Sequence, residues 1–209
     1  MTEGRTNSVD MVSGVRAPGN IKLPDQNFSV LGAITAAGGV NENLTNPQVR
    51  LTRGNQTYRT SLKRLFENPE LDTRLQGGDQ VIVEADLRYF LSLGAAGNES
   101  QFNFNRDTVS ALDALSIIGG VNDFRANPKG VLILREYPAT ALDAGTRGPR
   151  QQRVVFSIDL TTSDGLFSAR NFNIHSGDLV LATESAVSNI RTVAGLIGSA
   201  FGIINVATN

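Results

Sequence analysis

The sequence predicts an α+β protein in which one small domain occurs twice in tandem and is followed by an amphipathic helix. The prediction rests on an internal repeat, on matching helix and strand signals in both copies, and on a change of composition near the C-terminus. A chain of 209 residues is long enough for two small domains that each bury a core. We expect the first domain at residues 11–86, the second at 88–184 and the helix at 186–207.

The repeat is clearest where Gly-Gly-Val-Asn occurs twice, with 81 residues between equivalent positions. In each copy an Asn-Pro pair and a strand-like stretch follow, and after a loop a Gly-Asp turn precedes a last strand-like run. The second copy is longer, and its extra residues fit the Gly-, Pro- and Arg-rich loop Ala139–Gln152. The expected strands are Val49–Arg53 and Val81–Val83 in the first copy, and Val131–Arg135 and Leu179–Leu181 in the second.

A short helix precedes the glycines in each copy, at Ser29–Ala37 and Val109–Ile118, because apolar residues recur there at three- and four-residue steps. Ser29 is a suitable N-cap for the first helix, and Ser110 or Thr108 for the second. Glycine just after a helix adopts a left-handed backbone without steric cost. A phosphate-binding loop would have its glycines after a strand and before a helix, the reverse of the order here. We therefore interpret four glycines as structural turn residues: Gly38, Gly39, Gly119 and Gly120.

The composition disfavours catalysis, metal binding and nucleic-acid binding. The formal net charge is −1, whereas a nucleic-acid surface needs a basic excess. The chain has no Cys and one His, His175, so the usual nucleophile pairs and a His-based zinc site are unavailable. Asp79 and Asp178 recur at equivalent turns, which favours bonding to turn amides over an acid/base pair. We expect no enzyme activity, no cofactor and no metal, and we interpret His175 as a surface residue and Arg147–Arg153 as a solvated insertion.

The segment Ala186–Asn205 has a single charge, Arg191, and as a helix it would carry an apolar face opposite a stripe of small and polar residues. About 20 helical residues span roughly 30 Å, the thickness of a bilayer core. Its residues leave three interpretations open: a buried terminal helix, a helix lying in a membrane interface, or one of several helices in a membrane ring. In the ring, the lipid-facing residues are Val187, Ile190, Val193, Ile197, Phe201 and Ile204. The lumen-facing stripe is Ser188, Arg191, Thr192, Gly195, Ser199, Gly202 and Asn205.

The repeated block and three longer stretches resemble the C-terminal part of bacterial outer-membrane polysaccharide export proteins, which carry successive soluble-ligand-binding β-grasp (SLBB) domains. The stretches are VIVEADLRYFLSLGAAG (Val81–Gly97), NPKGVLILREYP (Asn127–Pro138) and the run Phe156–Ser185. The resemblance covers nearly the whole chain from about Val12. It implies two tandem SLBB-like β-grasp domains followed by the C-terminal amphipathic helix.

The resemblance also implies a function. Family members form homo-oligomeric rings, with β-grasp domains in the periplasm and a barrel of C-terminal helices in the outer membrane, for which Ala186–Asn205 is the matching segment. The ring is a passive exit channel for capsular polysaccharide or exopolysaccharide, and it works with an inner-membrane polysaccharide co-polymerase. The alternative is a soluble module that binds a sugar or small ligand, has no channel activity and packs its tail onto its own domains.

Family members normally begin with a secretion signal, often with a lipidated Cys, and with an export-specific domain. The first residues of this sequence contain no apolar run typical of a signal peptide. We therefore expect the sequence to be a fragment of a longer reading frame or a shortened homologue.

Overall fold

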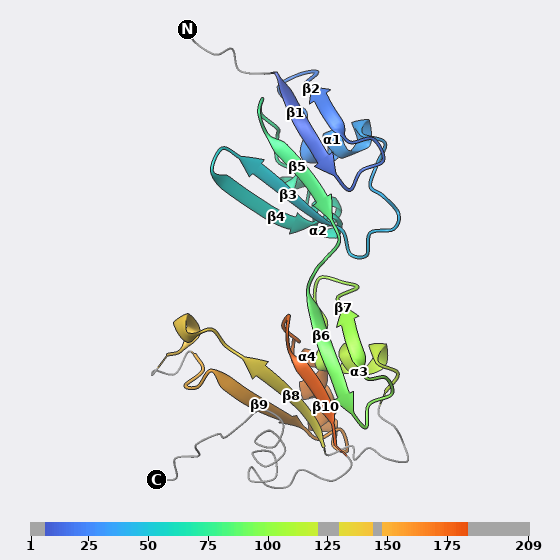
Figure 1. Cartoon of the computed structure of the whole chain (residues 1–209), viewed down its shortest axis with the longest axis vertical. Helices are drawn as coiled ribbons and strands as arrows, with labels where there is room; N and C mark the ends of the chain where they lie inside the picture. The colour runs from blue at the N-terminus through green and yellow to red at the C-terminus, as the bar shows by residue number, and fades with distance from the viewer. Residues whose placement is uncertain (1–6, 121–129, 144–147, 184–209) are drawn as a thin grey trace. The chain divides into compact units, whose positions relative to one another are not determined.

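The computed structural model describes residues 7–120, 130–143 and 148–183. The chain divides into two compact units (Figure 1). The first comprises Met1–Leu87 with Phe104–Asp107, and the second comprises Arg88–Asn103 with Thr108–Asn209.

The first unit contains a five-stranded mixed sheet in the order β2-β1-β5-β3-β4. The strand β5 is last in the sequence but central in the sheet, parallel to β1 and antiparallel to β3. The elements in chain order are β1 (Ser8–Ser13), β2 (Gly19–Lys22), α1 (Val30–Ala36), β3 (Gln48–Arg53), β4 (Gln56–Ser61), α2 (Leu62–Glu67), the 3₁₀ turn η1 (Pro69–Leu71) and β5 (Gln80–Glu84).

The second unit has the same arrangement, with the sheet order β7-β6-β10-β8-β9 (Figure 1). Its central strand β10 is again parallel to β6 and antiparallel to β8. Its elements are β6 (Tyr89–Gly94), β7 (Ser100–Asn103), α3 (Ala111–Ile117), β8 (Val131–Glu136), η2 (Ala139–Ala141), β9 (Arg153–Ile158), α4 (Ser163–Asn171) and β10 (Leu179–Ala182). The predicted α+β class is confirmed, and the sequence repeat is also a repeat of topology.

Matching backbone hydrogen bonds define which residues are equivalent in the two units. The N–H of Val30 donates to the carbonyl of Thr73, and in the second unit that of Ala111 donates to Phe172. Strand register adds a further pair. Leu51 of β3 lies opposite Tyr58, and Ile133, at the equivalent position of β8, lies opposite Phe156. Thr73 therefore corresponds to Phe172, and Tyr58 to Phe156.

The structure contains elements where the sequence predicts only loops. In each unit a second helix and an edge strand lie between the first predicted strand and the Gly-Asp turn: β4 and α2, then β9 and α4. The edge strand β4 was missed because four of its six residues are exposed and its sequence, QTYRTS, has no apolar alternation by which a strand is recognised. The predicted insertion Ala139–Gln152 lies between β8 and β9, where the first unit has only a two-residue turn between β3 and β4. The strand β1 begins at Ser8, slightly before residue 11, the expected start of the domain.

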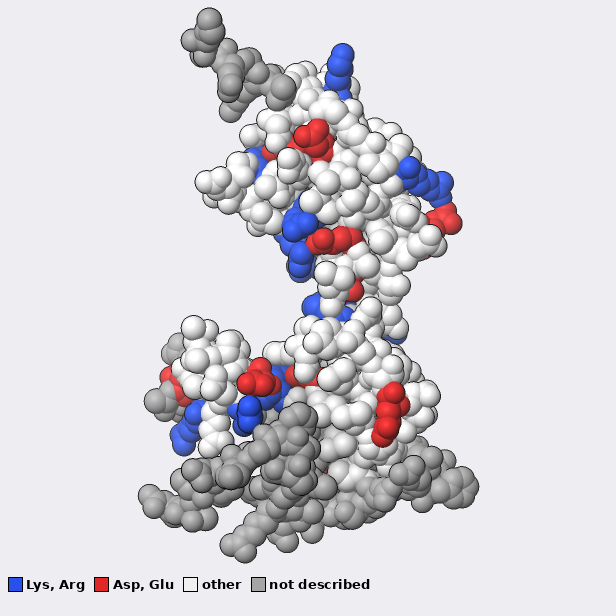
Figure 2. Space-filling view, in the orientation of Figure 1, with Lys and Arg blue, Asp and Glu red and all other residues white. Residues whose placement is uncertain are grey.

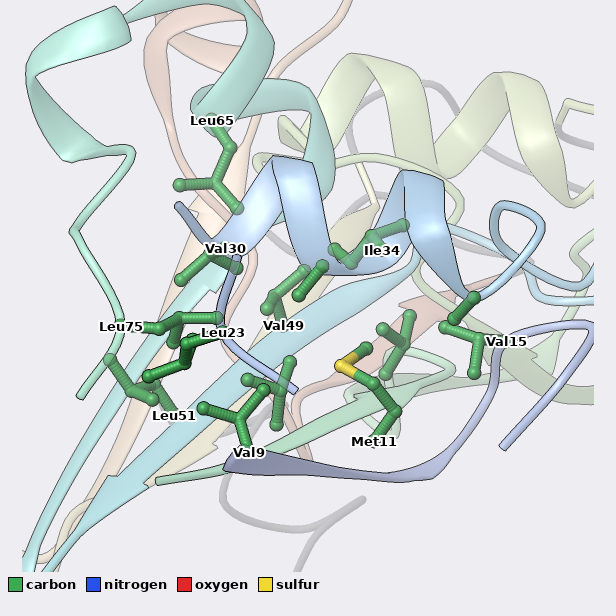
Figure 3. Packing of buried hydrophobic residues seen from close by; sticks show 14 residues of the cluster. Val9, Met11, Val15, Leu23, Val30, Ile34, Val49, Leu51, Leu65 and Leu75 are labelled. Atoms are coloured by element: carbon green, nitrogen blue, oxygen red, sulfur yellow. The ribbon is translucent and has the colours of Figure 1, made fainter. Parts of the chain in front are cut away.

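The core of the first unit forms between one face of the sheet and the helices (Figure 3). Alternate residues of β1 and β3 point into it, among them Val9 and Met11 of β1 and Leu51 of β3. Val30 and Ile34 of α1 cover this face, because they lie one helical turn apart. Figure 3 shows Leu65, Val30 and Leu51 toward one end of the core, where the candidate site lies.

The Gly-Gly pairs end the first helix of each unit in the same way. In α1 the N–H of Gly39 donates to Ile34 and that of Gly38 to Thr35, and α3 repeats both bonds. This is the Schellman motif, which satisfies the last carbonyls of a helix. All four glycines have positive φ, from 81° to 89°, including the second glycine of each pair. The N-caps are Ser29 and Ser110, and the latter forms a reciprocal capping box with Asp113.

Candidate functional site

The lipid-facing and lumen-facing residues predicted in the tail, from Val187 to Asn205, lie outside the described residues. Across the part of the chain that the structure describes, no helix is long and apolar enough to cross a membrane. The candidate site is therefore built from the two sheets and the helices that cover them.

A buried Arg–Asp pair occurs at the same place in both units. In the first unit, Nε and Nη2 of Arg53 donate to the two carboxylate oxygens of Asp79, at 2.9 and 2.7 Å. Nη2 of Arg53 also donates to the carbonyl of Arg74, and Oδ2 of Asp79 accepts the turn amide of Gln76 at 2.8 Å. The expected bond between Asp79 and its own turn is therefore present, but the carboxylate also fixes the end of β3 to the turn before β5. The hydrogen bond to Asp79 raises the pKa of Arg53.

The second unit repeats this geometry with Arg135 and Asp178, and it buries the pair more deeply. Arg135 Nη2 donates to Asp178 Oδ2 at 2.7 Å and to the carbonyl of Asn173 at 2.7 Å, and Asp178 Oδ2 accepts the amide of His175 at 2.8 Å. The Arg135 side chain is 8% exposed, against 28% for Arg53. Burial lowers the pKa of Arg135, but hydrogen bonds to Asp178 and Tyr137 outweigh it and the net shift is upward.

These contacts leave Asp79 and Asp178 unsuited to acid/base chemistry. Each carboxylate holds its own arginine and belongs to a different unit. His175 is exposed, as expected, and partial burial together with the charge of Arg135 lowers the pKa of its imidazole. Among the residues that the structure describes, no group of three or more His, Cys, Asp or Glu side chains is placed to hold a metal ion. The arrangement supports a structural role for both carboxylates.

The feature suited to binding is a groove of about 650 Å³ in the first unit, which we call the β4 groove. Its volume falls in the range of roughly 300–1,000 Å³ that is typical of small-molecule sites. The groove lies at the open edge of the sheet, between β4 and the segment formed by α2 and η1. Its apolar lining is Val30, Val49, Leu51, Leu65 and Leu71, and its polar lining is Arg53, Thr57, Tyr58, Arg59, Thr60, Glu70 and Thr73.

Both cations that line the β4 groove already have acidic partners. Arg53 is paired with Asp79, and Arg59 Nη2 lies 2.6 Å from Glu84 Oε1. On the face shown in Figure 2, most basic side chains likewise lie next to acidic ones. The groove therefore offers an apolar floor and a polar rim, with little net charge to select an ionic ligand.

The corresponding place in the second unit is occupied by aromatic side chains. Phe156 and Phe172 take the positions of Tyr58 and Thr73, and their rings meet edge to face with 4.8 Å between centroids. The guanidinium of Arg135 lies 5.0 Å from the centroid of Phe172 and 5.4 Å from that of Phe156. The two units thus share the Arg–Asp pair but differ in the space beside it.

Sequence reasoning found the two aspartates but missed their arginines and the β4 groove. A usable signal was present, because Arg53 and Arg135 end the equivalent strand-like stretches VRLTR and VLILR. A cation at the end of a buried strand in both copies, together with a buried acid in both, indicates a pair. The groove itself depends on β4 and α2, which the sequence did not reveal.

Comparison with known proteins defines first a class of domain. Residues 10–83 match the family model of the SLBB domain. The match spans the first unit from β1 to β5 and includes every residue that lines the β4 groove.

The chain as a whole is similar to proteins named for polysaccharide export. It is 28% identical to the capsule polysaccharide export protein BexD of Haemophilus influenzae, over 94% of this chain and 51% of that protein. It is 26% identical to the capsule polysaccharide export outer membrane protein CtrA of Neisseria meningitidis, over 92% of this chain and 53% of that protein. The Vi polysaccharide export protein VexA/TviF of Salmonella typhi is 23% identical, over 93% of this chain and 54% of that protein.

These similarities confirm the resemblance to outer-membrane polysaccharide export proteins with SLBB domains. The chain spans about half the length of the curated relatives it matches. The relatives are named as export proteins rather than as enzymes.

Proposed function

We propose that this chain is part of a subunit of an outer-membrane channel that exports capsular polysaccharide or exopolysaccharide. The observation that carries the proposal is the similarity over more than nine tenths of the chain to three proteins named for the export of capsule or Vi polysaccharide. In this function the protein is a passive conduit without enzyme activity. The identical strand order of the two units supports assigning residues 11–86 and 88–184 as two SLBB-like β-grasp domains, although the family model matches only the first.

The channel is a homo-oligomeric ring in this proposal, with the two domains in the periplasm. Phe66 of α2 and Phe167 of α4 support a role in protein contacts, because both follow their helix N-cap by five residues and are 66% and 63% exposed. Aromatic side chains are enriched at protein–protein interfaces. An inner-membrane polysaccharide co-polymerase is the proposed partner that delivers the polysaccharide.

The tail supplies the membrane wall in the same proposal. Residues 186–207 form the amphipathic helix, with Ile190, Ile197 and Phe201 among the side chains that face lipid. Ser188, Thr192 and Ser199 belong to the stripe that faces the lumen. Small residues on that stripe allow helices to pack closely in a membrane.

The direct test compares the full chain with a version ending at Glu184 in mild detergent, by light scattering and negative-stain imaging. The proposal expects a discrete ring for the full chain and none for the shortened one. Monomers in both cases would overturn the channel and leave the alternative of a soluble sugar-binding module. A second test inserts the chain into a capsule export relative in place of the matched half and measures capsule at the cell surface, with the chimera ending at Glu184 as the control.

A further inference from the structure

The β4 groove has no role in the conduit described above, and the side chains at the equivalent place in the second unit differ from those that line it. There Phe156 and Phe172 meet edge to face, whereas in the first unit Tyr58 and Thr73 both line an open volume. Both places have an edge strand, a second helix and the Arg–Asp pair, but only in the first unit does a 3₁₀ turn, η1, follow that helix before the last strand. The opening therefore reflects the smaller or displaced side chains at these two positions together with η1, whose Glu70 and Leu71 line the groove.

The lining of the groove matches the chemistry of a sugar ring. A pyranose presents a face of C–H groups that packs on aromatic or aliphatic side chains, and a rim of hydroxyls that need hydrogen-bond partners. Tyr58 is 52% exposed and offers its ring beside the apolar floor of Leu51, Leu65 and Leu71. The exposed side chains of Glu70 and Thr73 belong to the lining beside this floor and can bond hydroxyl groups.

The charges of the lining favour a neutral sugar over an acidic one. The two arginines are already bonded to Asp79 and Glu84, so an added carboxylate would have to compete with a buried or half-buried acid. Glu70 adds an acidic group that repels a further carboxylate. An acetamido group suits the site, since its methyl can cover the apolar floor while its amide reaches the polar rim.

The location of the groove permits binding along a polymer. The strand β4 is the outer strand of its sheet, so the groove lies at an open edge. A sugar unit within a long chain can enter from the side while its neighbours remain in solvent. Because a conduit must release its cargo, weak binding at such a place is compatible with transport.

From these observations we propose that the β4 groove binds a neutral, N-acetylated hexose unit of a polysaccharide, with the ring stacked on Tyr58, and that Phe156 and Phe172 close the equivalent site in the second unit. This inference rests on the proposed export function only for the identity of the polymer. The binding itself is a property of the first unit.

The test is an NMR titration of the full 209-residue, ¹⁵N-labelled chain with chitotetraose, a neutral N-acetylated tetrasaccharide. We expect saturable shifts at amides of β4 and η1, with at least tenfold weaker binding of tetragalacturonate. The variant Tyr58→Phe/Thr73→Phe installs the aromatic pair of the second unit and should weaken chitotetraose binding at least tenfold. The variant Tyr58→Ala removes the stacking surface at an exposed position and should weaken it similarly, and it serves if the filled variant does not fold.

Tyr58→Phe alone is the matched control, because it keeps the ring and should leave the affinity within about threefold. The inference is overturned if millimolar chitotetraose gives no saturable shift, if the filled variant and Tyr58→Ala bind as the parent does, or if tetragalacturonate binds more tightly. A chain that forms rings in detergent but binds no chitotetraose would refute sugar binding in the β4 groove and leave the export proposal intact. A monomer that binds chitotetraose at β4 would do the reverse.

Discussion

Replacing Arg135 by Met should destabilise the second unit strongly, because the change leaves the buried carboxylate of Asp178 without its cationic partner. Asp178 is 1% exposed, and of the hydrogen bonds described above its carboxylate would retain the one from the amide of His175. The carbonyl of Asn173 would lose its bond as well. Breaking a buried ion pair by removing one partner costs about 3–5 kcal/mol, and this is the loss we expect in the free energy of unfolding.

The assay is urea denaturation followed by circular dichroism, with amide NMR to assign the transition to the second unit. The matched control is Arg153→Met, because Arg153 is 60% exposed and lies 4.0 Å from Glu136. An exposed pair of this kind contributes less than about 1 kcal/mol, so the control should unfold almost as the parent does.

The double variant Arg135→Met/Asp178→Leu separates two free energies: the cost of leaving a buried carboxylate unpaired, and the net contribution of the ion pair to stability. Replacing a buried ion pair by apolar side chains is often neutral or stabilising, so the double variant should recover most of the stability lost in the single one. An Arg135→Met protein within about 1 kcal/mol of the parent would refute the reasoning. So would a double variant that is less stable than the single one.

Three further changes test other parts of the structure. Ser92 Oγ is buried and has no hydrogen-bond partner in the described structure, so Ser92→Ala should leave the stability unchanged or raise it by about 1 kcal/mol, seen as an unchanged or higher melting temperature. A clear drop in the melting temperature would show that the hydroxyl is hydrogen-bonded. Gly39→Ala should cost about 1–2 kcal/mol of unfolding free energy through backbone strain alone, because φ is 89° and the new Cβ meets nothing within 4 Å; an unchanged denaturation midpoint would contradict this. The lowered pKa of His175 means that stability is lost as pH falls below its ordinary value of 6.5, so His175→Gln should flatten the fall in the urea midpoint between about pH 7 and 5.5, and equal slopes would argue against it.

The helix stops and the last strands could be predicted from the sequence because their signals are local. Gly38-Gly39 follows an apolar helix and precedes Asn-Pro, so the geometry of the turn is determined within a few residues. The run Val81–Val83 is recognisable because it is buried at alternate positions and enters from a Gly-Asp turn. The N-caps Ser29 and Ser110 could be predicted because each bonds an amide only three residues further along the chain.

The edge strands and the groove could not be predicted because they depend on distant contacts. The strand β4 is held by six register partners in β3, while its own side chains are mostly exposed. Arg53 and Asp79 are separated by 26 residues in sequence and meet only after β5 has entered the sheet. Which face of β4 borders an open volume is decided by α2 and η1, whose positions no local pattern specifies.

The central position of the last strand has a consequence for synthesis of the chain. In each unit two hairpins, β1–β2 and β3–β4 or β6–β7 and β8–β9, are joined in one sheet only through β5 or β10. A ribosome-bound chain therefore presents two separate ribbons with unpaired inner edges until the final strand has emerged, and such edges invite pairing with the wrong chain. Because both sheets have the same strand order, β5 could also insert into the second sheet and β10 into the first. The first unit is protected by the sequence of synthesis. The strand β5 emerges about a hundred residues before β10, so it can complete the first sheet before β10 is available to compete for its place.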